Sequence, residues 1–201
     1  VVADVVATDG TTGRASATSA VQLPRRWIGT ITLGQSIRSR VPGIEGSREF
    51  AVVRDVEVDL AEGEERKFLT IVAQGGSGSS VSTATSVECT STTRMSGPIV
   101  EDPVRQIPPQ LTLSPQGIYR LSFGSAMAFM TGTISGSGCP FSGAASPEAI
   151  GTGAVAEPRE FRALDAGLMR GSEPNVVRTG APDGSTFNET TSTVTWSLAP
   201  R

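Results

Sequence analysis

The chain has 201 residues, which is long enough to bury a core, and its net charge of −3 gives no basic footprint for nucleic acid or anionic lipid. It contains no histidine, which excludes Ser–His and Cys–His catalysis and histidine-ligated zinc. Lys67 is the only lysine among 17 basic residues, a bias that indicates a GC-rich, bacterial genome.

The first 23 residues predict an extended arm and a linker. A small apolar face recurs at strand spacing: Val1, Ala3, Val5 and Ala7. The polar, turn-rich residues 9–19 predict a tether, and residues 24–201 predict a single β domain. We expect residues 1–8 to form a strand that pairs with a second copy or a partner. The alternatives are a frayed terminus and an arm folded back on its own domain.

The strongest strand patterns lie in the first half of the β domain. Trp27–Leu33 predicts the first strand, and Phe50–Leu60 has the clearest period of two, with Arg54 as an inward-facing exception. Phe68–Ala73 predicts its partner strand, across a charged turn around Gly63. The expected inward positions of the longer strand are Val52, Val56, Val58 and Leu60.

The middle of the chain is rich in small residues and proline. Residues 74–97 fit either a flexible linker or a Thr-rich strand, and the strand is preferred because Thr and Val favour pleated surfaces. Residues 98–116 carry too many prolines for a central strand, so they predict an edge crossing with a short strand at 111–113. Gly117–Phe123 and Met127–Ile134 predict two further strands.

The last segment contains the one helix candidate, residues 157–171. Pro158 suits a first helical position, and apolar residues recur there at helical spacing, although a strand is also left open. Asp183-Gly184 predicts a turn before a final strand at Thr190–Leu198. Together these elements predict an all-β fold: an antiparallel β-sandwich, with a β-barrel as the alternative and at most one short helix.

Cys89 and Cys139 are the only cysteines, and they predict one disulfide in a secreted or cell-surface protein, with two unpaired thiols as the alternative. Two thiols without histidine leave a metal site incomplete, so no metal is expected. No apolar stretch predicts a membrane span. The start at Val1 without Met suggests removal of a signal peptide, and an excerpt from a longer chain is the alternative.

Three sets of residues suggest a catalytic or binding role, but each also has a simpler structural explanation. Asp55, Glu57 and Asp59 form an acidic row that would suit calcium or a carboxylate pair, but a solvated strand face is the simpler interpretation. Lys67 in a Ser–Lys dyad is disfavoured by its position in a charged turn. Four aromatic residues would line the pocket of a ligand-binding barrel or fill the core: Trp27, Tyr119, Phe123 and Trp196.

The sequence therefore predicts a non-enzymatic, extracellular or cell-surface protein with a structural or adhesive role, self-assembling through its N-terminal strand. A ligand-binding β-barrel is the second hypothesis, and a glycan-active enzyme using carboxylates is the third. No catalytic residue, metal ligand or cofactor is assigned. The expected partner is protein, copies of the chain included, and neither nucleic acid nor a membrane span is expected. A carbohydrate partner is left open but unsupported, because Trp27, Tyr119 and Trp196 lie on apolar strand faces and are expected in the core rather than exposed for stacking.

Overall fold

The computed structural model describes residues 2–6, 12–16, 24–101, 104, 106–139, 142–153, 159–164 and 167–201. The described residues form strands in three sheets, and none of them lies in an α-helix. The all-β prediction is therefore confirmed.

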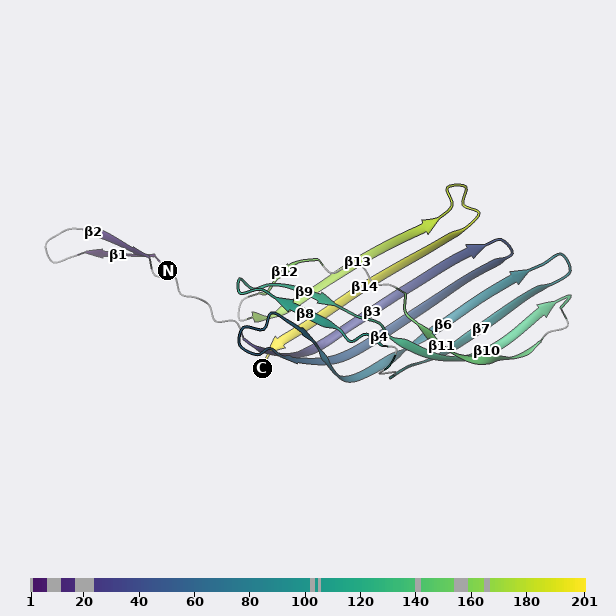
Figure 1. The fold of residues 1–201 in the computed structure, drawn as a ribbon, viewed down its shortest axis with the longest axis horizontal. Coiled ribbons are helices and arrows are strands. Elements are labelled where there is room, and N and C mark those ends of the chain that lie inside the picture. Colours follow the sequence, from purple (N-terminus) through teal and green to yellow (C-terminus); the bar gives the residue numbers. More distant parts are fainter. Residues whose placement is uncertain are drawn as a thin grey trace.

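The larger sheet is antiparallel and has eight strands in the order β11-β10-β7-β6-β4-β3-β14-β13 (Figure 1). Three of its strands are 16 residues long, far longer than the usual five or six. The strands are β3 (Arg26–Val41), β4 (Ile44–Asp59), β6 (Thr70–Thr85), β7 (Thr90–Val100), β10 (Met127–Ser137), β11 (Gly143–Gly151), β13 (Met169–Gly180) and β14 (Phe187–Pro200).

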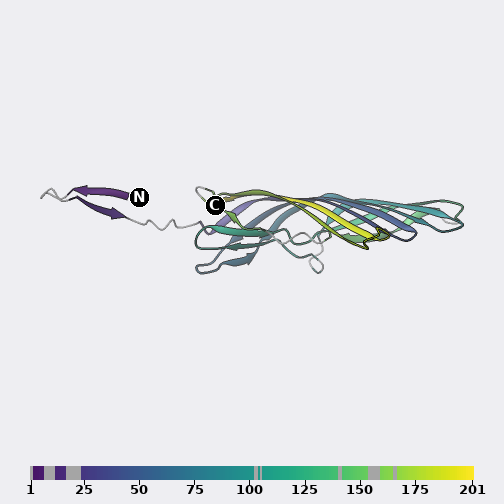
Figure 2. The same cartoon turned by 90° about the horizontal axis from the view of Figure 1, so that it is seen from above.

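The smaller sheet has four short strands in the order β12-β9-β8-β5, and it packs against one end of the larger sheet (Figure 2). Its strands are β5 (Arg66–Phe68), β8 (Gln110–Leu113), β9 (Ile118–Ser122) and β12 (Phe161–Arg162). The two layers form a β-sandwich, and the larger sheet does not close on itself. The sandwich prediction is confirmed, and the barrel alternative is wrong.

Strand alternation places the core where it was expected. Val56 and Val58 of β4 are buried, whereas Asp55 and Asp59 on the other face are exposed. The predicted hairpin is also confirmed, because β4 pairs with β6 through Val56 opposite Ile71. The partner segment differs at its start: residues 66–68 leave the hairpin and join the smaller sheet as β5.

The four aromatic residues proposed as a pocket lining are buried in the packed core. Trp27 is 0% exposed and Trp196 is 3% exposed. The Trp196 ring packs 4.7 Å from Phe161 and 6.5 Å from Tyr119, and its Nε1 donates to the Tyr119 hydroxyl at 2.9 Å. Trp27 of β3 lies opposite Pro200 of β14, and Trp196 lies opposite Ile31, so the two tryptophans occupy different positions along the paired strands.

Arg54 is the one charged side chain that is fully buried among the described residues. It donates to the carbonyl oxygen of Phe123 at 2.8 Å, to that of Ser125, and to Gln74 Oε1 at 2.6 Å. Its guanidinium lies 4.5 Å from the centre of the Phe123 ring. Burial lowers the pKa of Arg54 to about 10, and the side chain fastens β4 to the connection between β9 and β10.

The helix predicted within residues 157–171 is wrong for the residues that are described there. Phe161 belongs to β12 and faces Trp196, whereas Leu164 is 55% exposed. A turn closes at Gly167, whose N–H donates to the Leu164 carbonyl and whose φ of 78° is left-handed. The helical spacing of apolar residues was therefore coincidental, because one of its members points to solvent.

The Thr-rich segment 74–97 forms strands, as preferred, and residues 111–113 form the core of β8, as predicted. In the larger sheet, β11 and β13 were not predicted. They are the two edges of the larger sheet, and each carries a proline near its middle, Pro147 and Pro174. A proline on an edge strand removes an outward N–H that a further strand would need.

The N-terminal residues pair with each other. β1 (Val2–Val6) and β2 (Thr12–Ser16) form an antiparallel hairpin, which is the third sheet. The strand prediction for residues 1–8 agrees with β1, but the tether predicted at 9–19 contains β2, so that part is corrected. Val1 and Ala7 lie outside the described residues, and pairing of this arm with another chain stays a prediction.

Beyond the smaller sheet, the larger sheet continues as a single layer (Figures 1 and 2). We call this part, residues 36–49, 79–94, 133–137 and 175–191, the blade. The Cys89–Cys139 disulfide lies at its tip, with Cα atoms 5.0 Å apart, and joins the β6–β7 turn to the β10–β11 connection. The disulfide prediction is confirmed.

Candidate functional site: a cationic groove on the smaller sheet

A groove of about 570 Å³ lies on the outer face of the smaller sheet. This volume is in the range of small-molecule sites. Strand alternation builds the groove, because Leu111, Tyr119 and Leu121 point into the core and leave the residues between them on the outside. The lining residues are Arg66, Gln110, Thr112, Ser114, Ile118, Arg120, Ser122 and Glu160.

Two arginines approach the groove from opposite sides. Thr112 pairs with Arg66 on one neighbouring strand and with Arg120 on the other, so the three residues form one row across the sheet. Arg120 is held by Glu160, whose Oε1 accepts from its Nη2 at 2.5 Å and from its Nε at 3.2 Å. Arg66 donates to Gln110 Oε1 at 2.8 Å, and no carboxylate among the described residues pairs with it.

The charge of this lining is opposite to that of the whole chain. Two arginines and one glutamate give the groove a net charge of +1, in a protein whose net charge is −3. A guanidinium has five N–H donors, and Arg66 uses one of them in the bond to Gln110. The free donors and the uncompensated charge suit an anionic ligand that accepts hydrogen bonds.

The rim adds apolar and cationic surface. Phe68 pairs with Gln110 and is 55% exposed, so an aromatic ring lies beside the groove. Ile118 is 37% exposed and pairs with Arg162 of the edge strand. The groove therefore combines hydroxyl and amide groups with arginines and one exposed aromatic residue.

A second hollow, of about 430 Å³, lies on the outer face of the larger sheet. Its floor is made of small residues such as Gly34, Ala51 and Ser77, and Glu49 is its one carboxylate. Each hollow is thus lined by a single described carboxylate, whereas a glycosidase of the usual kind needs two that flank the scissile bond.

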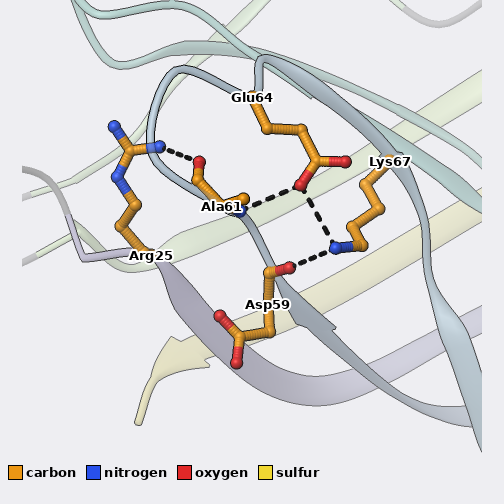
Figure 3. Close-up of polar contacts among 5 residues, drawn as sticks. All are labelled: Arg25, Asp59, Ala61, Glu64 and Lys67. Atoms are coloured by element: carbon orange, nitrogen blue, oxygen red, sulfur yellow. Dashed lines mark hydrogen bonds and ion pairs between the residues drawn. The ribbon is translucent and has the colours of Figure 1, made fainter.

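Lys67, the other candidate for chemistry, closes a turn (Figure 3). Its Nζ donates to the Asp59 carbonyl at 2.7 Å and to Glu64 Oε2 at 3.1 Å. The same Glu64 oxygen accepts from the Ala61 N–H at 2.9 Å, and Arg25 donates to the Ala61 carbonyl at 2.5 Å. The hydrogen bond from Ala61, followed by that from Lys67, lowers the pKa of Glu64 below its usual value. Lys67 is therefore engaged in structure rather than held beside a serine.

The acidic row lies on the outer face of β4, as predicted. Asp55 accepts from the Thr30 hydroxyl at 2.9 Å, and Glu57 lies 3.9 Å from Arg26. In the described part of the chain, no group of three or more acidic, histidine or cysteine side chains is placed to hold a metal ion. These contacts agree with a solvated, cross-strand-paired face.

Sequence reasoning missed the groove. Alternation in Gly117–Phe123 correctly placed Arg120 outside, but Arg66 was assigned to a turn. Nothing in the sequence brings these two arginines together, because their strands are separated by the whole of β6 and β7 in the other sheet.

No helix in the part of the chain that the structure describes has the length and hydropathy needed to cross a membrane. No protein-family model, no curated protein and no solved structure matches this chain.

Proposed function

We propose that this chain is a non-enzymatic extracellular protein with an adhesive role, and that the groove on its smaller sheet binds a short acidic oligosaccharide. The observation that carries the proposal is the cationic, hydroxyl-lined groove on an otherwise acidic protein. The disulfide at the blade tip supports an oxidising, extracellular location.

The choice of ligand follows from the donors in the groove. Arg66 and Arg120 match the geometry of a carboxylate, and Gln110 and Thr112 between them match sugar hydroxyls. Phe68 offers an apolar face beside them for a sugar ring. The sequence offered no exposed Trp or Tyr to stack against a sugar ring. In the structure, Phe68, the last residue of β5, is the exposed aromatic residue beside the groove.

The non-enzymatic part of the proposal rests on the shortage of catalytic groups. The chain has no histidine, Lys67 is paired with Glu64, and Glu160, the one carboxylate lining the groove, is already bonded to Arg120. This inventory favours binding without turnover.

Titration calorimetry with trigalacturonate, and with neutral maltotriose as the control ligand, tests the proposal. We expect heat of binding with trigalacturonate alone, and an affinity that falls as salt is added. Arg66→Gln should weaken binding about tenfold or more, since a charge-assisted hydrogen bond contributes about 1.5–3 kcal/mol. Arg38→Gln, on the far face of the larger sheet, should bind like the wild type.

Glu160→Gln gives a change of the opposite sign. Removing this carboxylate raises the charge of the groove and frees Arg120, so trigalacturonate should bind more tightly. Equal binding by the wild type and Arg66→Gln, or no binding by either, would contradict the proposed ligand. New reducing ends after prolonged incubation would instead indicate an enzyme.

A further inference from the structure

The two faces of the blade differ in charge. Its outer face carries Arg38, Arg40 and Glu45, and two cross-strand ion pairs hold it: Arg40–Glu45 at 2.5 Å and Arg178–Glu189. Such a surface is typical of a sheet face in contact with water.

The inner face of the blade continues the core face of the sheet and carries no charged side chain over its last two rows. Register places these residues together: Thr179, Asn188, Ser39, Gly46, Ser82, Thr93 and Ile134 in one row, and Val41, Ile44, Ala84, Ser91 and Gly136 in the next. Arg48, one row nearer the core, is the first charged residue on this face.

This uncharged face is exposed in the single chain. Val41 and Ile44 lie opposite each other and are 46% and 47% exposed. At the other end the smaller sheet covers the equivalent face, where Trp196 is 3% exposed and packs against Tyr119 and Phe161. One face of the blade is therefore uncharged, made of Ser, Thr, Asn, Gly and aliphatic residues, whereas the other face is charged.

We infer that the inner face of the blade packs against the same face of a second copy. In a two-fold contact the same patch meets itself, so a charged residue near the axis would approach its like. The absence of charge over these two rows removes that cost, and the small residues allow the close approach of two packed sheets.

The size of the face limits it to a weak dimer. Its twelve register positions, each about 4.8 Å across the strands and about 6.8 Å along them, give about 390 Å² per copy, or roughly 780 Å² for both. Specific interfaces begin near about 1,000 Å² in total, so we expect a reversible, concentration-dependent dimer. The hydroxyl-rich composition, with no exposed aromatic residue in these rows, disfavours a lipid surface as the occupant.

Sedimentation velocity over a concentration series tests this inference. The wild type should shift from monomer to dimer as its concentration rises. Ser82→Glu places a carboxylate in the centre of the face and should stay monomeric at every concentration. Thr83→Glu, the next residue on the outer face of the same strand, is the matched control and should dimerise like the wild type.

Folding is checked by near-UV circular dichroism. Ser39→Glu provides a second variant in the same row as Ser82, from which it is separated by Gly46. Both inner-face variants lie outside the core, so their spectra should match that of the wild type. A monomeric wild type at high concentration, or a Ser82→Glu protein that dimerises normally, would overturn the inference. Binding of a different protein to this face while the wild type stays monomeric would overturn it as well.

Discussion

At the scale of single residues, Arg54 is a charged side chain inside the core that links β4 to the connection between β9 and β10. It is a buried cation whose partners are two main-chain carbonyls and one amide oxygen. Strand alternation placed Arg54 on the inner face, but nothing in the sequence identified its acceptors, because Phe123 and Ser125 lie about 70 residues away in the chain. A buried arginine is stable there because these groups replace its hydration.

We predict that Arg54→Met lowers the free energy of unfolding by about 2–4 kcal/mol, because it leaves one buried and two part-buried acceptors without this donor. Arg54→Lys should recover part of this loss, since one ammonium cannot reach all three. Arg38→Met, at an exposed position, should change stability by less than about 0.5 kcal/mol. Urea unfolding measures all three, and equal losses for Arg54→Met and Arg38→Met would show that the network is unimportant.

Glu64 gives a pH-dependent prediction. Its pKa in the folded chain is lowered from 4.5, chiefly by the Ala61 N–H and then by Lys67. The stabilisation is therefore present above pH 4.5 and is lost as the pH falls through the lower, folded value. The difference in unfolding free energy between the wild type and Glu64→Gln should be larger at pH 7 than at pH 3.

At the scale of elements, the sequence predicts those strands that have one face in the core. β4, β9 and the second half of β14 alternate apolar and polar residues because the smaller sheet, or the larger one, covers one side. β11 and β13 do not show this alternation of apolar and polar residues. They are edges with proline near the middle, and much of β13 belongs to the single-layer blade, so neither shows a strong period.

The disulfide is an element-scale feature, since it ties two neighbouring hairpin ends together. Mass spectrometry of the unreduced protein should find no free thiol. Replacing both cysteines by serine should cost at most about 4 kcal/mol, the chain-entropy value for a separation of 50 residues. Hydrogen exchange should become faster at the β6–β7 turn and the end of β10, while the core part of β3 keeps its protection. Uniform loss of protection would show that the blade and the core unfold together.

At the scale of the whole molecule, the groove and the blade lie at different parts of the body and use different chemistry. The groove belongs to the smaller sheet, whereas the blade is the part of the larger sheet that the smaller one leaves uncovered (Figure 2). If the proposed dimer leaves its grooves accessible, two of the proposed ligand sites in one particle would raise the avidity for a repeated ligand such as a polysaccharide, as the proposed adhesive role requires.

The N-terminal hairpin leads to the last prediction, which concerns assemblies larger than a dimer. β1 pairs with β2 on one side, and its other edge has no partner strand among the described residues. An incoming strand finds few acceptors on the body, because Pro147 and Pro174 interrupt the edges of the larger sheet and the edges of the smaller sheet are two or three residues long. The longest stretch left is residues 175–180 of β13, where Val176 and Val177 are exposed.

We predict that residues 1–8 add to this stretch on another copy. Deleting residues 1–23 should then abolish particles larger than a dimer in electron micrographs and leave the blade-mediated dimer intact. Val176→Pro should have the same effect. The β13–β14 pairing continues without a break through Pro174, so the nitrogen of Pro174, which carries no hydrogen, faces the free edge of β13. Residue 176 has its N–H on that same side, and proline there would remove a donor that the incoming strand needs. Glu62→Pro, at an exposed position of the turn closed by the Glu64 N–H and the Ala61 carbonyl, is the control and should leave assembly unchanged. Large particles from the truncated protein would show that the arm has no part in assembly.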